Sequence, residues 1–248
     1  MRSRYENVKC RVVFVHGAGG GAWEWTIWRR VFAAHGWDAV ANDLQPAQGG
    51  LAHTRLDDYA RQVEGWKVTD ACDRARSEPA PVVLVGASLG AMLASIVAVR
   101  TAPAALVLVN PLPPADIEPQ PAFEDYPDVV PWGSARSFAS TCRAMTDADD
   151  AARWFAFRRW RDESGCALRE ARGAQVAAPS CPTLVVASEA DADVPMQASR
   201  ALARAWAAEF IELTGASHVG PLLGRDAAHV AARCREWIER ALTMTRAR

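Results

Sequence analysis

The chain has 248 residues, of which 50% are hydrophobic and 23% charged, and its formal net charge is −1 at pH 7. This size and composition are typical of one globular domain, or of one domain with an insertion. A nearly neutral chain has no long-range field to attract nucleic acid or an anionic membrane, so we expect neither as a partner. It has no run of about 18 apolar residues and no signal-peptide pattern, which predicts a cytoplasmic protein without membrane spans.

Six cysteines are scattered along the chain, without a Cys-x-x-Cys pair or a Cys/His spacing suited to zinc. We therefore expect no metal site. Three disulfides are one interpretation, but a core of this size does not need them, so reduced and mostly buried thiols are favoured. The cysteines are Cys10, Cys72, Cys142, Cys166, Cys181 and Cys234.

Six short apolar runs, several rich in valine, divide the sequence. They are nearly continuous rather than alternating, which is typical of strands buried on both faces of a parallel sheet. Stretches with helical spacing of apolar residues lie between them. This order predicts a doubly wound α/β sheet. The predicted strands are Val12–Val15, Asp38–Ala41, Val82–Val85, Ala105–Val109, Thr183–Ala187 and Glu209–Leu213.

The segment between the fourth and fifth predicted strands departs from this alternation. It begins with a cluster of prolines, which cannot continue a helix or a central strand, and then turns helical and rich in aromatic residues. About 70 residues are too many for a connecting loop. We expect residues 111–182 to form a helical cap, or lid, inserted into a core made of residues 1–110 and 183–248.

The third predicted strand runs into Gly86-Ala-Ser88-Leu-Gly90 and then into an alanine-rich segment. A serine at a sharp strand-to-helix turn is held in a strained backbone conformation, and side chains in place of the glycines would clash with strand and helix. The helix N-terminus favours negative charge developing nearby. The alternative is a turn whose serine has no catalytic role, but its place between a predicted strand and a predicted helix favours Ser88 as a nucleophile.

The first predicted strand ends in His16-Gly-Ala-Gly-Gly-Gly. Glycines allow the backbone to approach a ligand closely, and acyl transfer needs two N–H donors aimed at the tetrahedral oxygen. We assign this oxyanion role to the amides of Ala18 and Leu89. A phosphate-binding loop is the rival interpretation, but neither common glycine pattern for phosphate is satisfied. His16 is expected to hold the loop by a hydrogen bond.

His218 lies in a glycine-rich loop after the last predicted strand, at the sheet edge where doubly wound folds bind ligands, and we expect it to be the general base. Asp191, after the fifth predicted strand, would fix the tautomer of this histidine. Asp193 is the second choice and could instead cap the following helix. In an extended loop the two aspartates would point to opposite sides, so only one would face His218.

The order serine, aspartate, histidine is that of the α/β-hydrolases and of neither other common triad order. The chain resembles this superfamily over essentially its whole length, in the segments VVFVHGAGGGAW, VVLVGASLGA, TLVVASEADADVP and LTGASHVGPLLG. The pattern His-Gly-Ala-x-x-Gly-Ala-Trp-x-Trp at His16–Trp25 resembles the branch of methyl esterases and hydroxynitrile lyases. The resemblance implies a mostly parallel sheet of about six strands with helices on both faces, no cofactor, and an acyl-enzyme mechanism.

Two departures bear on the activity. Hydroxynitrile lyases of that branch have a lysine beside the catalytic histidine and a threonine after the first histidine, where this chain has Val219 and Gly17. We therefore expect a serine hydrolase acting on a small-molecule carboxylic ester. The alternatives on the same triad are a C–C bond hydrolase, a lyase, a cofactor-free dioxygenase, and a non-catalytic ligand receptor.

The cap is expected to set the substrate. Gly17, Trp23 and Trp160 are the candidate substrate-binding residues, although the tryptophans could instead belong to the core. Cap arginines could meet an anionic acyl group, but a solvated helix face is favoured for them. These arginines are Arg153, Arg158, Arg159 and Arg161.

Overall fold

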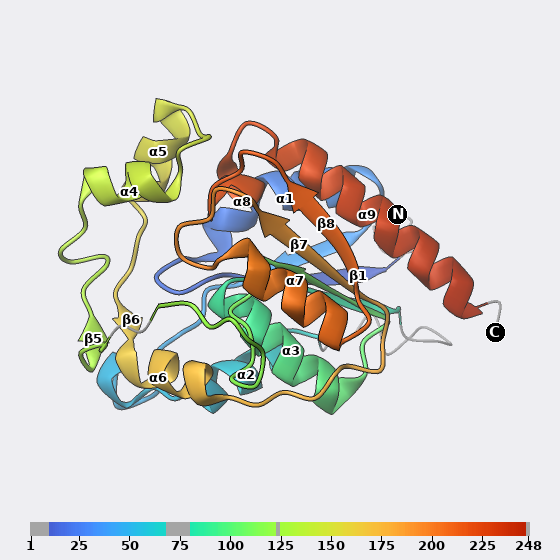
Figure 1. Ribbon diagram of the computed structural model, residues 1–248, viewed down its shortest axis with the longest axis horizontal. Helices are drawn as coiled ribbons and strands as arrows, with labels where there is room; N and C mark the ends of the chain where they lie inside the picture. The colour runs from blue at the N-terminus through green and yellow to red at the C-terminus, as the bar shows by residue number, and fades with distance from the viewer. Residues whose placement is uncertain (1–9, 68–79, 123–124, 247–248) are drawn as a thin grey trace, which may run out of the picture.

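The computed structural model describes residues 10–67, 80–122 and 125–246 (Figure 1). The strands of its central sheet are β1 (Arg11–Val15), β2 (Asp38–Ala41), β3 (Val82–Ala87), β4 (Ala105–Val109), β7 (Thr183–Ser188) and β8 (Glu209–Leu213). Their order is β2-β1-β3-β4-β7-β8, and every neighbouring pair is parallel. The predicted fold class and all six predicted strands are confirmed.

Helices cover both faces of this sheet (Figure 1). Alternate residues of a strand point to opposite faces, so Val12 and Phe14 join one core cluster while Val13 and Val15 join the other. Burial on both sides explains the continuous apolar runs. The first face holds α1 (Thr26–Ala34), α8 (Gly220–Leu223) and α9 (Ala227–Arg246). The second face holds α2 (Leu56–Trp66), α3 (Leu89–Thr101) and α7 (Met196–Ala205). In the described part of the chain, no helix combines the length and apolar character needed to span a bilayer.

The segment between β4 and β7 contains five further elements. They are β5 (Val129–Val130), α4 (Phe138–Ala144), α5 (Asp150–Phe157), β6 (Glu163–Ser164) and α6 (Gly165–Gly173). Helices α4 and α5 lie beyond the carboxyl ends of the central strands, whereas α6 lies beside α2 (Figure 1). Strands β5 and β6 form a separate antiparallel pair, which the sequence did not reveal because two-residue strands leave no periodic pattern. Two short 3₁₀ helices, Ala22–Trp25 and Leu51–His53, complete the described structure.

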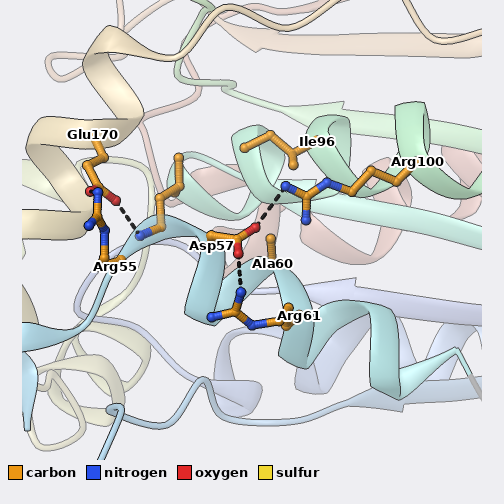
Figure 2. A pocket seen from close by; sticks show the side chains of 8 residues that line it. Arg55, Asp57, Ala60, Arg61, Ile96, Arg100 and Glu170 are labelled. Atoms are coloured by element: carbon orange, nitrogen blue, oxygen red, sulfur yellow. Dashed lines mark hydrogen bonds and ion pairs between the residues drawn. The ribbon is translucent and has the colours of Figure 1, made fainter. Parts of the chain in front are cut away.

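Charged side chains join α2 to α3 and α6 along a surface groove (Figure 2). Glu170 of α6 accepts a hydrogen bond from the N–H of Leu56 at the start of α2 (2.9 Å) and pairs with Arg55 (2.6 Å). Arg100 of α3 pairs with Asp57 of α2 (2.8 Å). A carboxylate at a helix N-terminus satisfies a free amide and complements the helix dipole. These contacts therefore fix the end of the inserted segment to the main body.

The described cysteines form no disulfide. Cys10 and Cys234 are buried, whereas Cys142, Cys166 and Cys181 are partly exposed. The prediction of free thiols is confirmed for these residues, but the prediction that most are buried is wrong. Cys72 lies outside the described residues.

Strands β1 and β3 and helix α3 approach so closely that two positions require glycine. A Cβ atom on Gly86 would lie within 3.0 Å of the carbonyl oxygen of Gly90, and one on Gly90 within 3.0 Å of the carbonyl oxygen of Val15. Both obstacles are backbone atoms, which cannot move without separating the helix from the sheet. The first turn of α3 is thus packed directly on the end of β1.

We expect Gly90→Ala to lower the free energy of unfolding by about 1–3 kcal/mol or more, because the new methyl group forces strand and helix apart. Gly65→Ala in α2 is the matched control, since a Cβ there meets nothing within 4 Å. That control should raise stability by roughly 0.5–1 kcal/mol through its helix propensity. Urea unfolding of both variants measures the effects, and effects of the same sign would contradict the packing described here.

Candidate active site

Ser88 occupies the turn between β3 and α3 with φ 53° and ψ −121°, a backbone conformation that residues other than glycine rarely adopt. Such strain costs on the order of 1–3 kcal/mol and persists only where surrounding bonds impose it. Here the N–H of Ser88 donates to the carbonyl of Val109 (3.0 Å), and its own carbonyl accepts from the amides of Ala91 (3.0 Å) and Met92 (3.3 Å). The serine is thereby held at the N-terminus of α3.

The glycine-rich loop after β1 lies directly against Ser88. A Cβ on Gly17 would be 3.2 Å from Cβ and 3.9 Å from Oγ of Ser88, so a larger residue would crowd the hydroxyl. The carbonyl of Gly17 accepts from the N–H of Gly20 (3.2 Å) and from Nδ1 of His16 (2.8 Å). The N–H of Ala18 shares this peptide plane and points opposite to the carbonyl. These two bonds therefore fix the direction of the Ala18 amide.

His16 supports this loop in a defined tautomer. Its Nε2 accepts the N–H of Leu44 (2.9 Å), so the proton lies on Nδ1 and is donated to Gly17. The imidazole is fully buried, and burial lowers its pKa to about 4. A histidine that is neutral at pH 7 and engaged at both nitrogens holds structure rather than transferring protons.

The two amides predicted for an oxyanion hole are unengaged. No hydrogen bond between described residues uses the N–H of Ala18 or of Leu89. The neighbouring amide of Gly19, by contrast, donates to Oε2 of Glu163 in β6 (2.9 Å). Leu89 is the first residue of α3, where free amides are expected. Both N–H groups are thus free to bind a ligand oxygen.

A buried glutamate beneath the loop was missed by the sequence analysis. Glu24 is 4% exposed, and its Oε2 accepts the N–H of Gly17 (3.2 Å). Burial raises the pKa of Glu24 to about 8. The available signal was a charged residue between Trp23 and Trp25 in the motif that follows the first strand.

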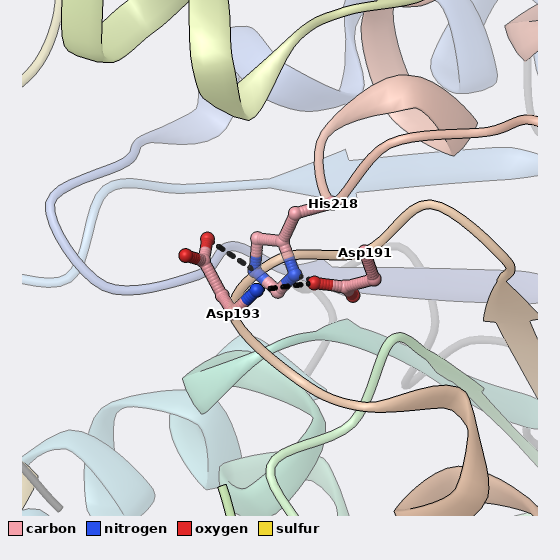
Figure 3. A group of neighbouring side chains, drawn as sticks. All are labelled: Asp191, Asp193 and His218. Carbon is pink, nitrogen blue, oxygen red and sulfur yellow. Dashed lines mark hydrogen bonds and ion pairs between the residues drawn. The ribbon is translucent and has the colours of Figure 1, made fainter. Parts of the chain in front are cut away.

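Asp191 and His218 meet where the loops after β7 and β8 come together (Figure 3). The Nδ1 atom of His218 lies 2.7 Å from Oδ2 of Asp191, whose side chain is only 1% exposed. The other oxygen, Oδ1, accepts the amides of Asp193 (2.8 Å) and Val194 (2.9 Å). One carboxylate therefore shapes its own loop and orients the imidazole.

The expectation that only one of the two aspartates faces His218 is wrong. The bonds to Oδ1 of Asp191 fold the loop into a turn, so the two side chains do not diverge as they would in an extended strand. As a result Oδ2 of Asp193 lies 4.0 Å from Nε2 of His218 (Figure 3). This distance is too long for a hydrogen bond.

Carboxyl groups surround the imidazole of His218. Burial lowers the pKa of His218, but Asp191, Asp193 and Glu24 together outweigh this effect and raise it to about 9.

Asp191, Asp193 and His218 also form a described group whose donor atoms lie within 4.8 Å of one another, as a metal site requires. The bond between Nδ1 and Asp191 already engages two of those atoms. Between the described side chains of Ser88 and His218 no hydrogen bond is formed; such bonds often tighten only with substrate.

Asn110 links the loops of the site and was also missed. It follows β4 and is 2% exposed. Its Nδ2 donates to the carbonyl of His218 (2.7 Å) and to Oγ of Ser188 (2.9 Å), while its Oδ1 accepts the N–H of Ser188 (2.8 Å). A polar residue that ends the apolar run of β4 was the only signal in the sequence.

The inserted segment contacts the loops on both sides of the site. The hydroxyl of Ser217, next to His218, donates to Oδ1 of Asp147 (2.5 Å). On the other side, the N–H of Arg161 donates to the carbonyl of Gly19 (2.8 Å). Residues between α4 and α6 thus support both the histidine loop and the glycine-rich loop.

The tryptophans of the glycine-rich loop and of the inserted segment have different environments. Trp23 and Trp160 pack edge to face with ring centroids 5.0 Å apart, which joins the glycine-rich loop to the inserted segment. Trp154 is 44% exposed and stacks on Phe138 with centroids 4.0 Å apart. Trp25 is fully buried and belongs to the core.

Of the four cap arginines, Arg161 reaches the main body, where its Nη2 donates to the carbonyl of Leu44 (3.0 Å). The other three contact carbonyl groups or aromatic rings of their own segment, in agreement with a helix-face role. They are Arg153, Arg158 and Arg159.

We expect NMR titration to separate the two histidines of the site, with His16 titrating near pH 4 and His218 near pH 9. Asp191→Asn should lower the pKa of His218 more than Asp193→Asn, because the charge that it removes is buried and lies 2.7 Å from the imidazole, whereas that of Asp193 is exposed and lies 4.0 Å away. If both histidines titrate near the solvent value of about 6.5, the burial and pairing described here are incorrect.

The sequence matches the model of the Alpha/beta hydrolase family over residues 12–232. No curated protein matches it. Among solved structures, the chain is similar to the methylesterase MES16 from Arabidopsis, with 16% identity and a TM-score of 0.70 over 92% of this chain and 98% of that one. This similarity is consistent with the resemblance of His16–Trp25 to the methyl esterase branch.

Two further structures are similar at comparable levels. A pyrethroid hydrolase from Sphingobium faniae JZ-2 has 17% identity and a TM-score of 0.70, with 93% of this chain and 97% of that one covered. A thermophilic esterase from Thermogutta terrifontis has 18% identity and a TM-score of 0.66, with coverage of 95% and 91%. The TM-scores establish a shared fold. The match of the family model to most of the sequence shows that the chain belongs to the alpha/beta hydrolase family.

Proposed function

We propose that this protein hydrolyses small carboxylic esters, with Ser88 as nucleophile, His218 as general base and Asp191 as the orienting acid. The observation that carries the proposal is the strained turn of Ser88 at a helix N-terminus, against the glycine-rich loop, with the amides of Ala18 and Leu89 both unengaged. Strain of this kind concentrates at functional sites. The names of the similar structures, a methylesterase, a pyrethroid hydrolase and an esterase, support the same class of reaction.

In the proposed reaction, Oγ of Ser88 attacks the ester carbonyl carbon and its proton passes to Nε2 of His218. The carbonyl oxygen becomes an oxyanion that accepts the amides of Ala18 and Leu89. Collapse of this intermediate breaks the bond to the alcohol oxygen, which takes the proton from His218. Water then attacks the acyl-enzyme by the same route, which releases the carboxylic acid and restores Ser88.

The environment of each group fits its proposed role. Asp191 fixes the tautomer of His218 in which Nε2 is free once the imidazole has lost its proton, which the pKa of about 9 places at alkaline pH, and its charge favours the imidazolium that forms in the reaction. The amide of Ala18 is directed by bonds to the carbonyl of Gly17, so little reorganisation is needed as charge develops. Loss of one such donor typically costs about 10²–10³ in rate. No step requires a cofactor.

We further propose that residues 111–182 act as the cap over this site and that Gly17, Trp23 and Trp160 line the substrate pocket. The packing of Trp160 on Trp23 supports this assignment, because it places a cap residue against the glycine-rich loop. The position of α4 and α5 beyond the carboxyl ends of the strands agrees with it (Figure 1).

Ser88→Ala should abolish labelling by a fluorophosphonate and reduce ester turnover by a factor on the order of 10⁶, because only binding and the oxyanion amides remain. Ser140→Ala, at an exposed serine of α4, is the matched control and should behave as wild type. Circular dichroism checks that both variants fold. Full labelling of Ser88→Ala would place the nucleophile elsewhere.

Trp160→Ala should change the preference for acyl chain length by about tenfold while altering turnover of a small acetate ester much less, since it removes a proposed pocket wall and not a reacting group. Trp154→Ala is the comparison, because that ring is exposed and contacts Phe138 and Phe157. Rates on p-nitrophenyl esters of increasing length provide the measurement. If Trp160→Ala lowers the rate equally on every ester, Trp160 belongs to the core and not to the pocket wall.

A further inference from the structure

Asp193 places a second carboxylate beside Nε2 of His218, the nitrogen that faces the reacting atoms in the proposed mechanism. Its Oδ2 lies 4.0 Å from Nε2, the nitrogen that returns a proton to the departing alcohol in the proposed mechanism. The side chain is 61% exposed, and within the described chain His218 is its one cationic partner at ion-pair distance. The carboxylate therefore presents negative charge where the alcohol part of an ester would leave.

The backbone of the loop, and not only the rotamer of the side chain, sets the position of Asp193. Its backbone N–H donates to Oδ1 of Asp191 (2.8 Å), in the same turn that directs Oδ2 of Asp191 to His218. The turn that seats the proposed catalytic acid thus also brings Asp193 to the opposite nitrogen of the imidazole (Figure 3).

Proton transfer fixes where an ester must lie relative to this carboxylate. The alcohol oxygen must come within about 2.6–3.2 Å of Nε2 to receive the proton. Groups two or three bonds beyond that oxygen then lie close to Asp193, because its carboxylate is 4.0 Å from the same nitrogen. The acyl part is held on the other side of the scissile bond, by Ser88 and the amides of Ala18 and Leu89.

We infer that Asp193 is a specificity-determining residue that favours esters whose alcohol part carries a cation two or three bonds from the ester oxygen, and disfavours anionic alcohol parts. The inference rests on the proposed function and adds a substrate class to the same site. A unit charge near a partly exposed carboxylate changes the rate by about fivefold to tenfold. Added salt reduces this preference.

The test compares two esters of the same shape, choline acetate and its uncharged isostere 3,3-dimethylbutyl acetate. At low ionic strength, kcat/KM of the wild type should be about fivefold to tenfold higher for the cationic ester. Asp193→Asn keeps the side-chain shape and should bring the ratio close to one. Glu209→Gln removes the same charge at an exposed residue that begins β8, at the end of the sheet away from the site, and should keep the wild-type ratio. Each ratio is taken within one variant, so a change in the basicity of His218 cancels.

A second pair of esters moves the charge to the acyl part: ethyl 4-(trimethylammonio)butanoate and ethyl 5,5-dimethylhexanoate. Asp193→Asn should change this ratio much less than the first. A wild-type ratio near one for the choline pair, a ratio that survives in Asp193→Asn, or equal effects on both pairs would overturn the inference.

The two proposals fail in distinguishable ways. Fluorophosphonate labelling of Ser88 without hydrolysis of the choline ester overturns the inference alone. Absence of both labelling and hydrolysis of all four esters overturns the proposed function, and the inference with it.

Discussion

The close approach of α3 to the end of β1 is the constraint on which the site depends. Gly86 and Gly90 allow backbone to lie against backbone, with no side chain between helix and strand. This contact brings the N-terminus of α3, and Ser88 with it, up to the loop that leaves β1. The adjacency of Ser88 and Gly17 follows directly, and with it the nearness of two elements that each carry an unengaged amide. A strained serine and a paired set of donors are therefore consequences of the same packing.

The remaining groups are held by carboxylate and amide side chains that each make several bonds. Asp191 binds His218 through one oxygen and its own turn through the other. Asn110 binds the end of β7 and the backbone of His218. Because the carboxyl ends of parallel strands meet at one edge, these short side chains can reach loops far apart in the sequence. The strained backbone of Ser88 is tolerated because the surrounding bonds over-determine it.

Much of the fold followed from the sequence because its strongest signals are local. Strands buried on both faces leave continuous apolar runs, and a Gly-x-Ser-x-Gly turn between a strand and a helix has few other structural explanations. Asn110 and Glu163 escaped notice for the opposite reason. Their partners are distant in the chain, and Glu163 bonds Gly19 from 144 residues away. A buried polar residue whose partner is remote carries no periodic pattern, and Asp193 was misjudged because hydrogen bonds, not residue spacing, decide how its loop turns.

The inserted segment helps to hold the loops of the candidate site. Its Asp147 holds the serine beside His218, and its Glu163 holds an amide next to that of Ala18. These bonds are short and partly or fully buried, so in a low-dielectric setting each contributes more than an exposed bond would. A displacement of the segment would leave the buried carboxylate of Glu163 and the partly buried carboxylate of Asp147 without their donors, which is costly. The segment proposed to select the substrate is therefore also part of what holds the proposed catalytic loops in position. Differences in substrate fit can reach the reacting groups through Asp147 and Glu163 as well as through direct contact.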